Sequence, residues 1–145
     1  DTPVQVAAYR SRISGPLMDR IDLHVDVPAV AYEDLRGAGG AEPSADVRER
    51  VQTARVVQRE RFADTGIHCN AQMGAQLQRQ HCSLDNDGHK LLERVVDRLG
   101  MSARACDRIV KVARTIADLE LSPHISSRHI AEAIQYRKLD RRDSV

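Results

Sequence analysis

Aromatic residues are scarce in this chain, which has one Phe, three Tyr and no Trp among its 145 residues. Proteins that bind single-stranded nucleic acid by base stacking present aromatic side chains, so the composition does not favour a surface of that kind. Apolar residues make up 41% of the chain and must build the core from Val, Leu, Ile and Ala. Such a core suits packed helices.

Cysteines and long apolar runs are also few. The three cysteines, an odd number, argue against a disulfide scaffold and favour a reducing compartment. No signal peptide is present, and no apolar run approaches the roughly 18 residues that a membrane-spanning helix needs. We therefore expect a soluble, cytoplasmic protein that does not contact a membrane.

Charge of one sign does not dominate, because 22 basic residues face 21 acidic ones. No strong overall field therefore directs the chain to nucleic acid or to a membrane. Only Lys90, Lys111 and Lys138 are lysines, so arginine supplies the other positive charges. This excess fits phosphate or carboxylate recognition, or the coding bias of a source genome, and we favour the second explanation.

Residues 101–121, MSARACDRIVKVARTIADLEL, give the clearest helical pattern. Ser102 is a good N-cap and directly follows Gly100, a good terminator for a preceding helix. Arg104, Arg108 and Lys111 are three and four residues apart and form a basic stripe beside a broad apolar face. That face consists of Ala103, Cys106, Ile109, Val110, Ala113, Ile116 and Ala117. So wide a face predicts a helix at the centre of a bundle.

The pattern as a whole predicts a mainly α protein, a four-to-five-helix bundle preceded by a short helix and one orphan β-strand. Residues 2–5, TPVQ, form a capping box for a first helix to about Arg12. Bundle helices are expected from Ser44 to near Gly66, over 74–82, from Asp85 to Leu99, over 101–121, and from Ser126 or Ser127 onward. In the first of these, the inward side chains should be Val47, Val51, Ala54, Val57 and Phe62.

Residues 21–27, IDLHVDV, alternate apolar and polar side chains and predict the strand. A single strand cannot satisfy its own backbone groups, so its sheet partners must lie outside this chain. The chain also lacks an initiating Met, and we expect it to be a fragment. Residues 29–43 are rich in glycine and predict a flexible linker between residues 1–28 and a helical domain over 44–140, with a disordered tail over 141–145.

Two stretches make a family recognisable. Residues 9–25, YRSRISGPLMDRIDLHV, closely resemble the end of the AAA+ core in magnesium-chelatase-like ATPases, and most nearly their competence-type (ComM/YifB) branch. Residues 102–120, 129–133 and 136–137 resemble the helical lid of the same branch, and residues 69–73, CNAQM, also fit. The resemblance covers nearly the whole chain. It implies that residues 1–28 are the tail of the ATPase core and that 44–140 are its lid.

The resemblance implies a part of an ATP-driven ring, in which nucleotide lies between neighbouring subunits. Arg20 matches the arginine finger of the L-L-D/S-R-F/I-D motif, which is shared with the replicative minichromosome-maintenance helicases. Such a guanidinium reaches the γ-phosphate across the interface and stabilises the charge of the transition state. From the residues alone, Arg20 could instead pair with Asp19 or Asp22 at the surface.

Arg104 matches the sensor-2 arginine at the start of a lid helix. A helix N-terminus with an added cation favours an anionic phosphate, which suits that role. The alternative is a salt bridge from Arg104 to Asp107 or Asp97. Arg108, one turn further on, is a weaker candidate for the same nucleotide contact.

No G-x-x-x-x-G-K-[ST] phosphate loop and no apolar strand ending in paired acids occur in the chain. The chain should therefore be inactive alone and bind no cofactor, with ATP and Mg²⁺ belonging to a longer parent. The implied partners are the other subunits of a homo-oligomeric, hexameric ring, and DNA in competence or recombination. Two alternatives remain: a stand-alone helical module that binds DNA or protein, and a metal-chelatase-type subunit that remodels a protein.

Two further groups of residues could carry chemistry. The pairs His68–Cys69 and His81–Cys82 match no common zinc spacing, so we predict no metal site. The basic residues Arg137, Lys138, Arg141 and Arg142 could contact DNA. Acidic residues interrupt them, and basic side chains also suit the C-terminal end of a helix, so a structural role is favoured.

Overall fold

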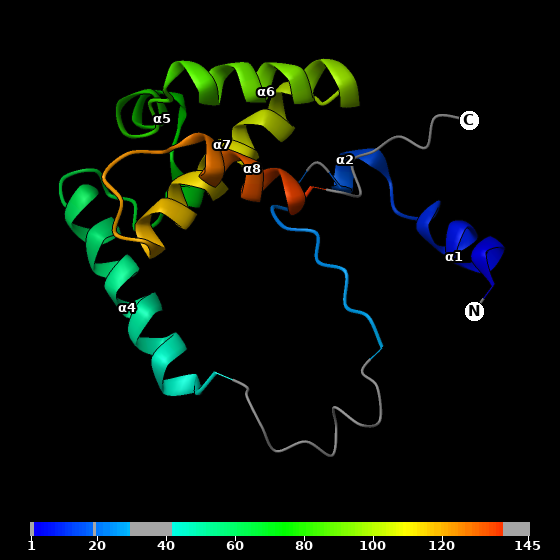
Figure 1. The fold of residues 1–145 in the computed structure, drawn as a ribbon, viewed down its shortest axis with the longest axis horizontal. Helices are drawn as coiled ribbons and strands as arrows, with labels where there is room; N and C mark the ends of the chain where they lie inside the picture. Colours follow the sequence, from blue (N-terminus) through cyan, green and yellow to red (C-terminus); the bar gives the residue numbers. More distant parts are fainter. Residues whose placement is uncertain (1, 19, 30–41, 138–145) are drawn as a thin grey trace.

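The computed structural model describes residues 2–18, 20–29 and 42–137, and within these ranges the chain is mainly helical (Figure 1). Helices α1 (Pro3–Arg10) and α2 (Gly15–Met18) come first. The bundle follows, with α4 (Ser44–Arg61), the 3-10 helix η1 (Asn70–Gln72), α5 (Ala75–His81), α6 (Asn86–Leu99), α7 (Ala103–Leu119) and α8 (Ser127–Gln135). The expected helical bundle is confirmed. Most of the predicted linker and all of the predicted tail lie outside the described residues.

Local capping signals place several helix ends where the sequence predicts them. The Oγ1 of Thr2 accepts a hydrogen bond from the Gln5 backbone N–H, and Gln5 Oε1 accepts one in return, which completes the capping box. Asp85 and Ser102 each accept from the backbone N–H three residues on, at 2.7 and 3.2 Å. Gly100 ends α6 with a φ of +59°, a left-handed conformation that costs glycine little.

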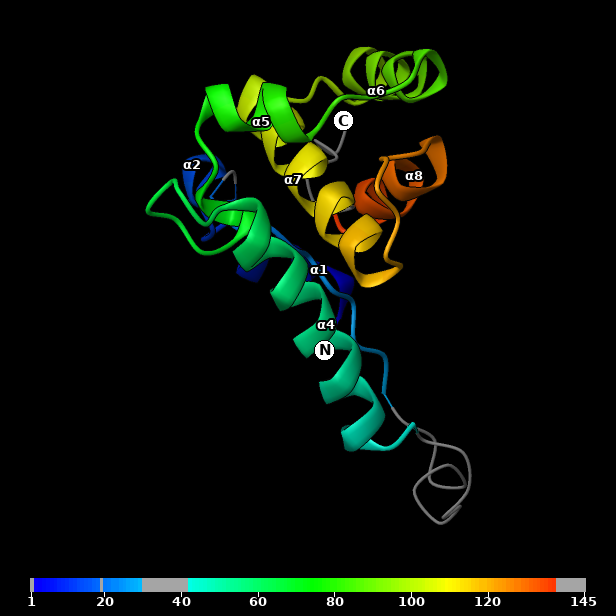
Figure 2. The same ribbon diagram turned by 90° about the vertical axis from the view of Figure 1, so that its left-hand side faces the viewer.

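Helix α7 is the centre of the bundle, as its broad apolar face predicts. It packs against α8, α4 and η1, while α6 packs against α8 (Figures 1 and 2). Its inward side chains are almost fully buried, and they meet the single Phe of the chain, Phe62, just after the end of α4. The α7 members of the core are Ala105, Ile109, Val110, Ala113, Ile116 and Ala117.

Helix α4 differs from its expected packing. Ala54 and Phe62 are buried as predicted, but Val47 and Val51 are 37% and 42% exposed. The reason is geometric, because the N-terminal end of α4 extends beyond the rest of the bundle (Figure 2). The apolar spacing correctly identified a helix but not how much of the helix has a partner.

The predicted strand over residues 21–27 does not form. These residues run without regular secondary structure, and among the described residues they pair with no other strand. Their apolar side chains do not form a buried face, since His24 is buried whereas Leu23 and Val25 are 48% and 65% exposed. A strand needs a sheet to bond its backbone, so without one the backbone contacts the helical bundle instead. The described residues contain one isolated bridge, between Leu84 and Ile125.

Candidate functional site

Arg20 lies in the turn that follows α2, and its side chain is exposed. Its backbone N–H donates to the Leu17 carbonyl oxygen at 3.0 Å, which closes that turn. Of the two acids that could have neutralised it, Asp22 is bound to another arginine and Asp19 lies outside the described residues. Within the described part of the chain, the Arg20 guanidinium therefore makes no ion pair.

Asp22 instead pairs with Arg108 of α7. The Arg108 Nη1 donates to the Asp22 Oδ1 at 2.5 Å, and both side chains are partly exposed, at 29% and 39%. The contact joins the turn of Arg20 to the middle of the bundle. It also occupies the guanidinium that the sequence suggested as a second nucleotide contact.

Two backbone contacts attach the same segment to the end of α8. The backbone N–H of His24 donates to the Tyr136 carbonyl oxygen at 2.7 Å. The Arg137 guanidinium donates to the carbonyl oxygen of Ile21, and the Arg137 side chain is buried. Arg137 is therefore structural, and it is not part of a surface that could bind DNA. Lys138, Arg141 and Arg142 lie outside the described residues.

Arg104 is the second residue of α7 and its side chain is exposed. Neither predicted salt-bridge partner is used, because Asp107 pairs with Lys111 at 3.0 Å and Asp97 forms no ion pair with a described residue. Arg104 thus presents its charge at the N-terminus of a 17-residue helix. A positive side chain at that end of a helix favours an anion, because the helix dipole has the same sign there.

The C-terminal half of α7 holds a buried polar cluster that the sequence did not predict. Asp118 has a fully buried side chain and accepts hydrogen bonds from Arg61 at 2.7 and 2.5 Å. Arg114 Nε donates to it at 3.0 Å and Asn70 Nδ2 at 2.8 Å. Asn70 also donates to the Thr115 hydroxyl at 3.0 Å. Arg61, Arg114 and Asn70 thus each donate to the carboxylate, which offsets the cost of burying its charge.

Residues 69–73, which resemble the family, supply one member of this cluster, Asn70. The Asn70 backbone N–H donates to Gln58 Oε1 at 3.1 Å, and its side chain links Arg61 to Asp118. The one available sequence signal was Arg114 and Asp118, four residues apart, within the apolar face of α7. Charged residues in such a position need a buried partner.

A second polar contact connects the ends of α7 and α8. The buried His129 accepts at Nδ1 from the Ser126 backbone N–H at 2.9 Å, so its proton lies on Nε2. That nitrogen donates to Glu120 Oε2 at 3.0 Å. This hydrogen bond, with a smaller contribution from the charge of Arg128, lowers the pKa of Glu120. The segment that resembles the family at residues 129–133 therefore fixes the start of α8.

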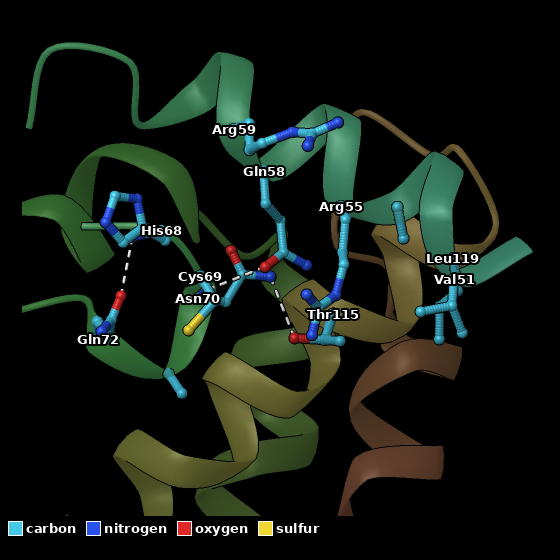
Figure 3. Close-up of a pocket in the computed structure, with 12 residues that line it drawn as sticks. Val51, Arg55, Gln58, Arg59, His68, Cys69, Asn70, Gln72, Thr115 and Leu119 are labelled. Atoms are coloured by element: carbon cyan, nitrogen blue, oxygen red, sulfur yellow. Dashed lines mark hydrogen bonds between the residues drawn. The ribbon is translucent and has the colours of Figure 1, made fainter. Parts of the chain in front are cut away.

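A pocket of about 610 Å³ lies between α4, η1 and α7 (Figure 3). Arg55 and Arg59 of α4 border it, and the Arg55 side chain extends toward Thr115 (Figure 3). Its polar wall is formed by Asn70 and its bonded neighbours, and beside them the His68 backbone N–H donates to Gln72 Oε1 at 2.8 Å. These groups satisfy one another, so the pocket is part of the structural cluster.

The His/Cys pairs are not brought together. Among the described residues, no three His, Cys, Asp or Glu side chains lie close enough to hold a metal ion. Cys82 is buried, and that burial raises its pKa to about 11. None of the helices that the structure describes has an apolar stretch suited to crossing a membrane.

The sequence matches two family profiles over the regions just described. Residues 41–137 match the C-terminal domain of the magnesium chelatase subunit ChlI, and residues 1–35 match the magnesium chelatase subunit ChlI itself. The chain therefore belongs to the magnesium-chelatase-like family, and its helical bundle is the C-terminal domain of that family.

Similar proteins are found in several bacteria. The chain is 39% identical over 141 residues to the competence protein ComM of Haemophilus influenzae, and 40% identical over 141 residues to the protein YifB of Salmonella typhimurium. A protein of Mycobacterium tuberculosis is 33% identical over 132 residues. The first two matches cover 97% of this chain but 27% of each relative. The chain thus spans about a quarter of the length of these proteins, and it fits their ComM-type branch.

Proposed function

We propose that this chain is the lid region, with the end of the ATPase core, of a cytoplasmic AAA+ ATPase that works as a homo-oligomeric ring. In this proposal Arg20 acts as an arginine finger on the nucleotide of a neighbouring subunit, and Arg104 acts as a sensor-2 residue. The observation that carries the proposal is that both arginines are exposed and, within the described residues, form no ion pair. Both also lie in family-matched segments. Arg108 and Arg114, in contrast, each form an ion pair with an aspartate.

The proposed role of Arg20 in hydrolysis is electrostatic. As the γ-phosphoryl group is transferred, negative charge builds on its oxygens, and a guanidinium placed there in advance stabilises that charge. Arg104, whose charge adds to the positive end of the α7 dipole, suits a phosphate contact that orders the lid on bound nucleotide. An arginine is always charged near neutral pH, so neither residue needs activation by a base.

The other parts of an ATPase site must come from outside this chain. The 145 residues hold no phosphate loop and no paired acids at a strand end. Mg²⁺, where bound, would neutralise phosphate charge, and the residues described offer no set of carboxylates to hold it. We therefore expect the isolated chain to bind ATP weakly, and a micromolar affinity by titration calorimetry would contradict this division of the site.

The decisive experiment is Arg20→Ala in the full-length ATPase. We expect turnover to fall on the order of a thousandfold while the affinity for ATP stays within about twofold. The matched control is Arg48→Ala, which removes an exposed arginine from the first turns of α4, far along the sequence from both Arg20 and Arg104. Hydrolysis at the wild-type rate in the Arg20 variant would refute the finger assignment.

The substrate of the motor has two candidates. The name of the Haemophilus relative favours DNA in competence or recombination, and the family description favours remodelling of a protein, as in a metal chelatase. A stand-alone DNA-binding module is a poorer fit, because the net charge is +1 and Arg137 is buried. Stimulation of the full-length ATPase by DNA, measured at several salt concentrations, would favour DNA over a protein as the substrate of the motor.

A further inference from the structure

The segment that carries Arg20 is attached to the bundle just after that residue. The Asp22 carboxylate is bound by Arg108, and the Ile21 carbonyl is bound by the buried Arg137. We call Asp22, Arg108 and Arg137 the latch. Its members come from the segment after α2, from α7 and from the end of α8, so the latch joins three regions that are distant in sequence.

We propose that the latch is a positioning device, which fixes Arg20 relative to Arg104 so that the lid and the finger move as one body. This inference rests on the proposed roles of those two arginines. Asp22 is two residues from Arg20, a span of at most about 7 Å of extended chain. Arg108 is four residues from Arg104 on the same helix, a rise of about 6 Å. The Asp22–Arg108 ion pair therefore ties a residue two positions from Arg20 to a residue about one helical turn from Arg104.

Stability does not explain the Asp22–Arg108 pair. Both side chains are partly exposed, and ion pairs of that kind contribute little to folding stability. The pair instead prevents a competing contact. Without Arg108, the Asp22 carboxylate could pair with Arg20, which is two residues away. By binding Asp22, Arg108 leaves the Arg20 guanidinium exposed for a phosphate.

The buried member of the latch acts on the backbone. The Arg137 side chain is 1% exposed, and it directs its guanidinium at the carbonyl of the residue next to Arg20. The His24 N–H adds a second backbone bond to Tyr136, at 2.7 Å. The chain on the C-terminal side of Arg20 is thus held at a backbone oxygen, a side-chain carboxylate and a backbone N–H in succession. A rotation of the lid must carry Arg20 with it.

The first test follows amide exchange in the 145-residue chain. In Asp22→Asn and in Arg108→Gln, the His24 amide should exchange about two- to fivefold faster than in the wild type, because the segment opens locally more often. The exchanged pair Asp22→Arg with Arg108→Asp should restore slow exchange. The matched control is Asp107→Asn, which breaks the Lys111–Asp107 pair on the same helix and should leave the His24 amide unchanged. Unchanged exchange in both single latch variants would overturn the proposal.

The second test measures ATP hydrolysis by the full-length protein. Each single latch variant should lower kcat on the order of ten- to a hundredfold with KM within about twofold, as expected for a misplaced catalytic group. The exchanged pair should recover most of kcat, and Asp107→Asn should not alter it. A purely structural role would lower kcat only together with the midpoint of unfolding, whereas a positioning role lowers kcat while that midpoint stays unchanged.

The outcomes separate this inference from the proposed function. If Arg20→Ala leaves kcat unchanged, the finger assignment fails and the latch has nothing to position. If Arg20→Ala abolishes turnover while Asp22→Asn and Arg108→Gln turn over at the wild-type rate, the proposed function stands and the latch proposal is wrong.

Discussion

Arg61 and Asp118 are 57 positions apart in the sequence and form a two-pronged ion pair, with Nη1 to Oδ2 at 2.7 Å and Nη2 to Oδ1 at 2.5 Å. The pair joins the last residue of α4 to the end of α7 in the interior of the bundle. The Asp118 side chain has no exposed surface, and that of Arg61 is 13% exposed. Parallel hydrogen bonds of this type fix orientation as well as distance.

Asp118→Asn should therefore destabilise the fold strongly. The change keeps the shape but removes the charge that two guanidiniums share, one of which belongs to Arg114, a side chain only 3% exposed. Leaving a buried charge without its partner costs about 3–5 kcal/mol. The measurement is the free energy of unfolding in urea.

The control for that variant is Asp87→Asn, since Asp87 and Lys90 form a pair at 4.0 Å with highly exposed side chains. It should change stability by less than about 0.5 kcal/mol. Equal effects of the two variants would mean that the buried cluster is not stabilising the bundle.

His81 should make stability depend on pH. Its ring packs edge-on against Phe62 at 5.9 Å, and burial lowers its pKa below 6.5, with the positive charges of Arg61 and Arg114 acting in the same direction. The unfolded chain then binds a proton at about pH 6.5 while the folded chain does so only at lower pH. Between these two values the unfolded state holds more protons, so stability falls as the pH is lowered below 6.5.

The test compares unfolding free energies at pH 7.5 and 5.5. His81→Gln should reduce the loss of stability between these pH values, and His124→Gln, at an exposed position, should not. Carboxylates with ordinary or lowered pKa values, such as Glu120, titrate below this range and do not interfere. The same pH dependence in wild type and His81→Gln would refute the assignment.

The three cysteines should differ sharply in reactivity. Burial raises the pKa of Cys82 to about 11 and also raises that of Cys106. At pH 8, about one Cys82 in a thousand is then a thiolate, which is the reactive form. Cys69 and Cys106 are both partly buried, but Cys69 borders the open pocket beside η1, whereas Cys106 packs against the core.

A disulfide reagent at pH 8 should therefore modify one thiol quickly in the folded chain and all three in denaturant. Cys69→Ser should abolish the fast phase. A fast phase that persists in this variant would mean that Cys82 or Cys106 reacts quickly and that the assignment to Cys69 is wrong.

Arg104→Ala should separate activity from stability. Because its side chain is exposed and, within the described part of the chain, forms no ion pair, its loss should change the unfolding free energy by less than about 0.5 kcal/mol. In the full-length ATPase it should lower kcat by about a hundredfold, as when one preorganised donor is removed. Arg104→Lys keeps the charge and should recover part of that loss.

The sequence correctly predicted those features that depend only on neighbouring residues, such as helix ends. The helix ends at Asp85, Gly100 and Ser102 depend on residues within one turn, and all three are where they were expected. The strand at 21–27 is not confirmed, because a strand is stable only with a partner and the described residues offer none. The exposed Val47 and Val51 were missed for a related reason, since periodicity shows which face is apolar but not what covers it.

The site was only partly predictable. Arg20 and Arg104 were found through a family resemblance, and their roles remain predictions. Asp118 gave little signal, because an acid near the end of a helix usually lies in water and its partner Arg61 is far away in the sequence. The latch was missed because Asp22 and its partner Arg108 are brought together only by the tertiary fold.

Substitutions at the two ends of α7 should have different consequences, because one end holds the buried cluster and the other holds the exposed Arg104. Changes around Arg114 and Asp118 would remove the protein from the cell through unfolding and degradation, whatever its activity. Changes at Arg104 would leave the amount of protein unaltered. A genetic selection for variants that are abundant yet inactive would therefore collect substitutions in the first turn of α7 and almost none in its last.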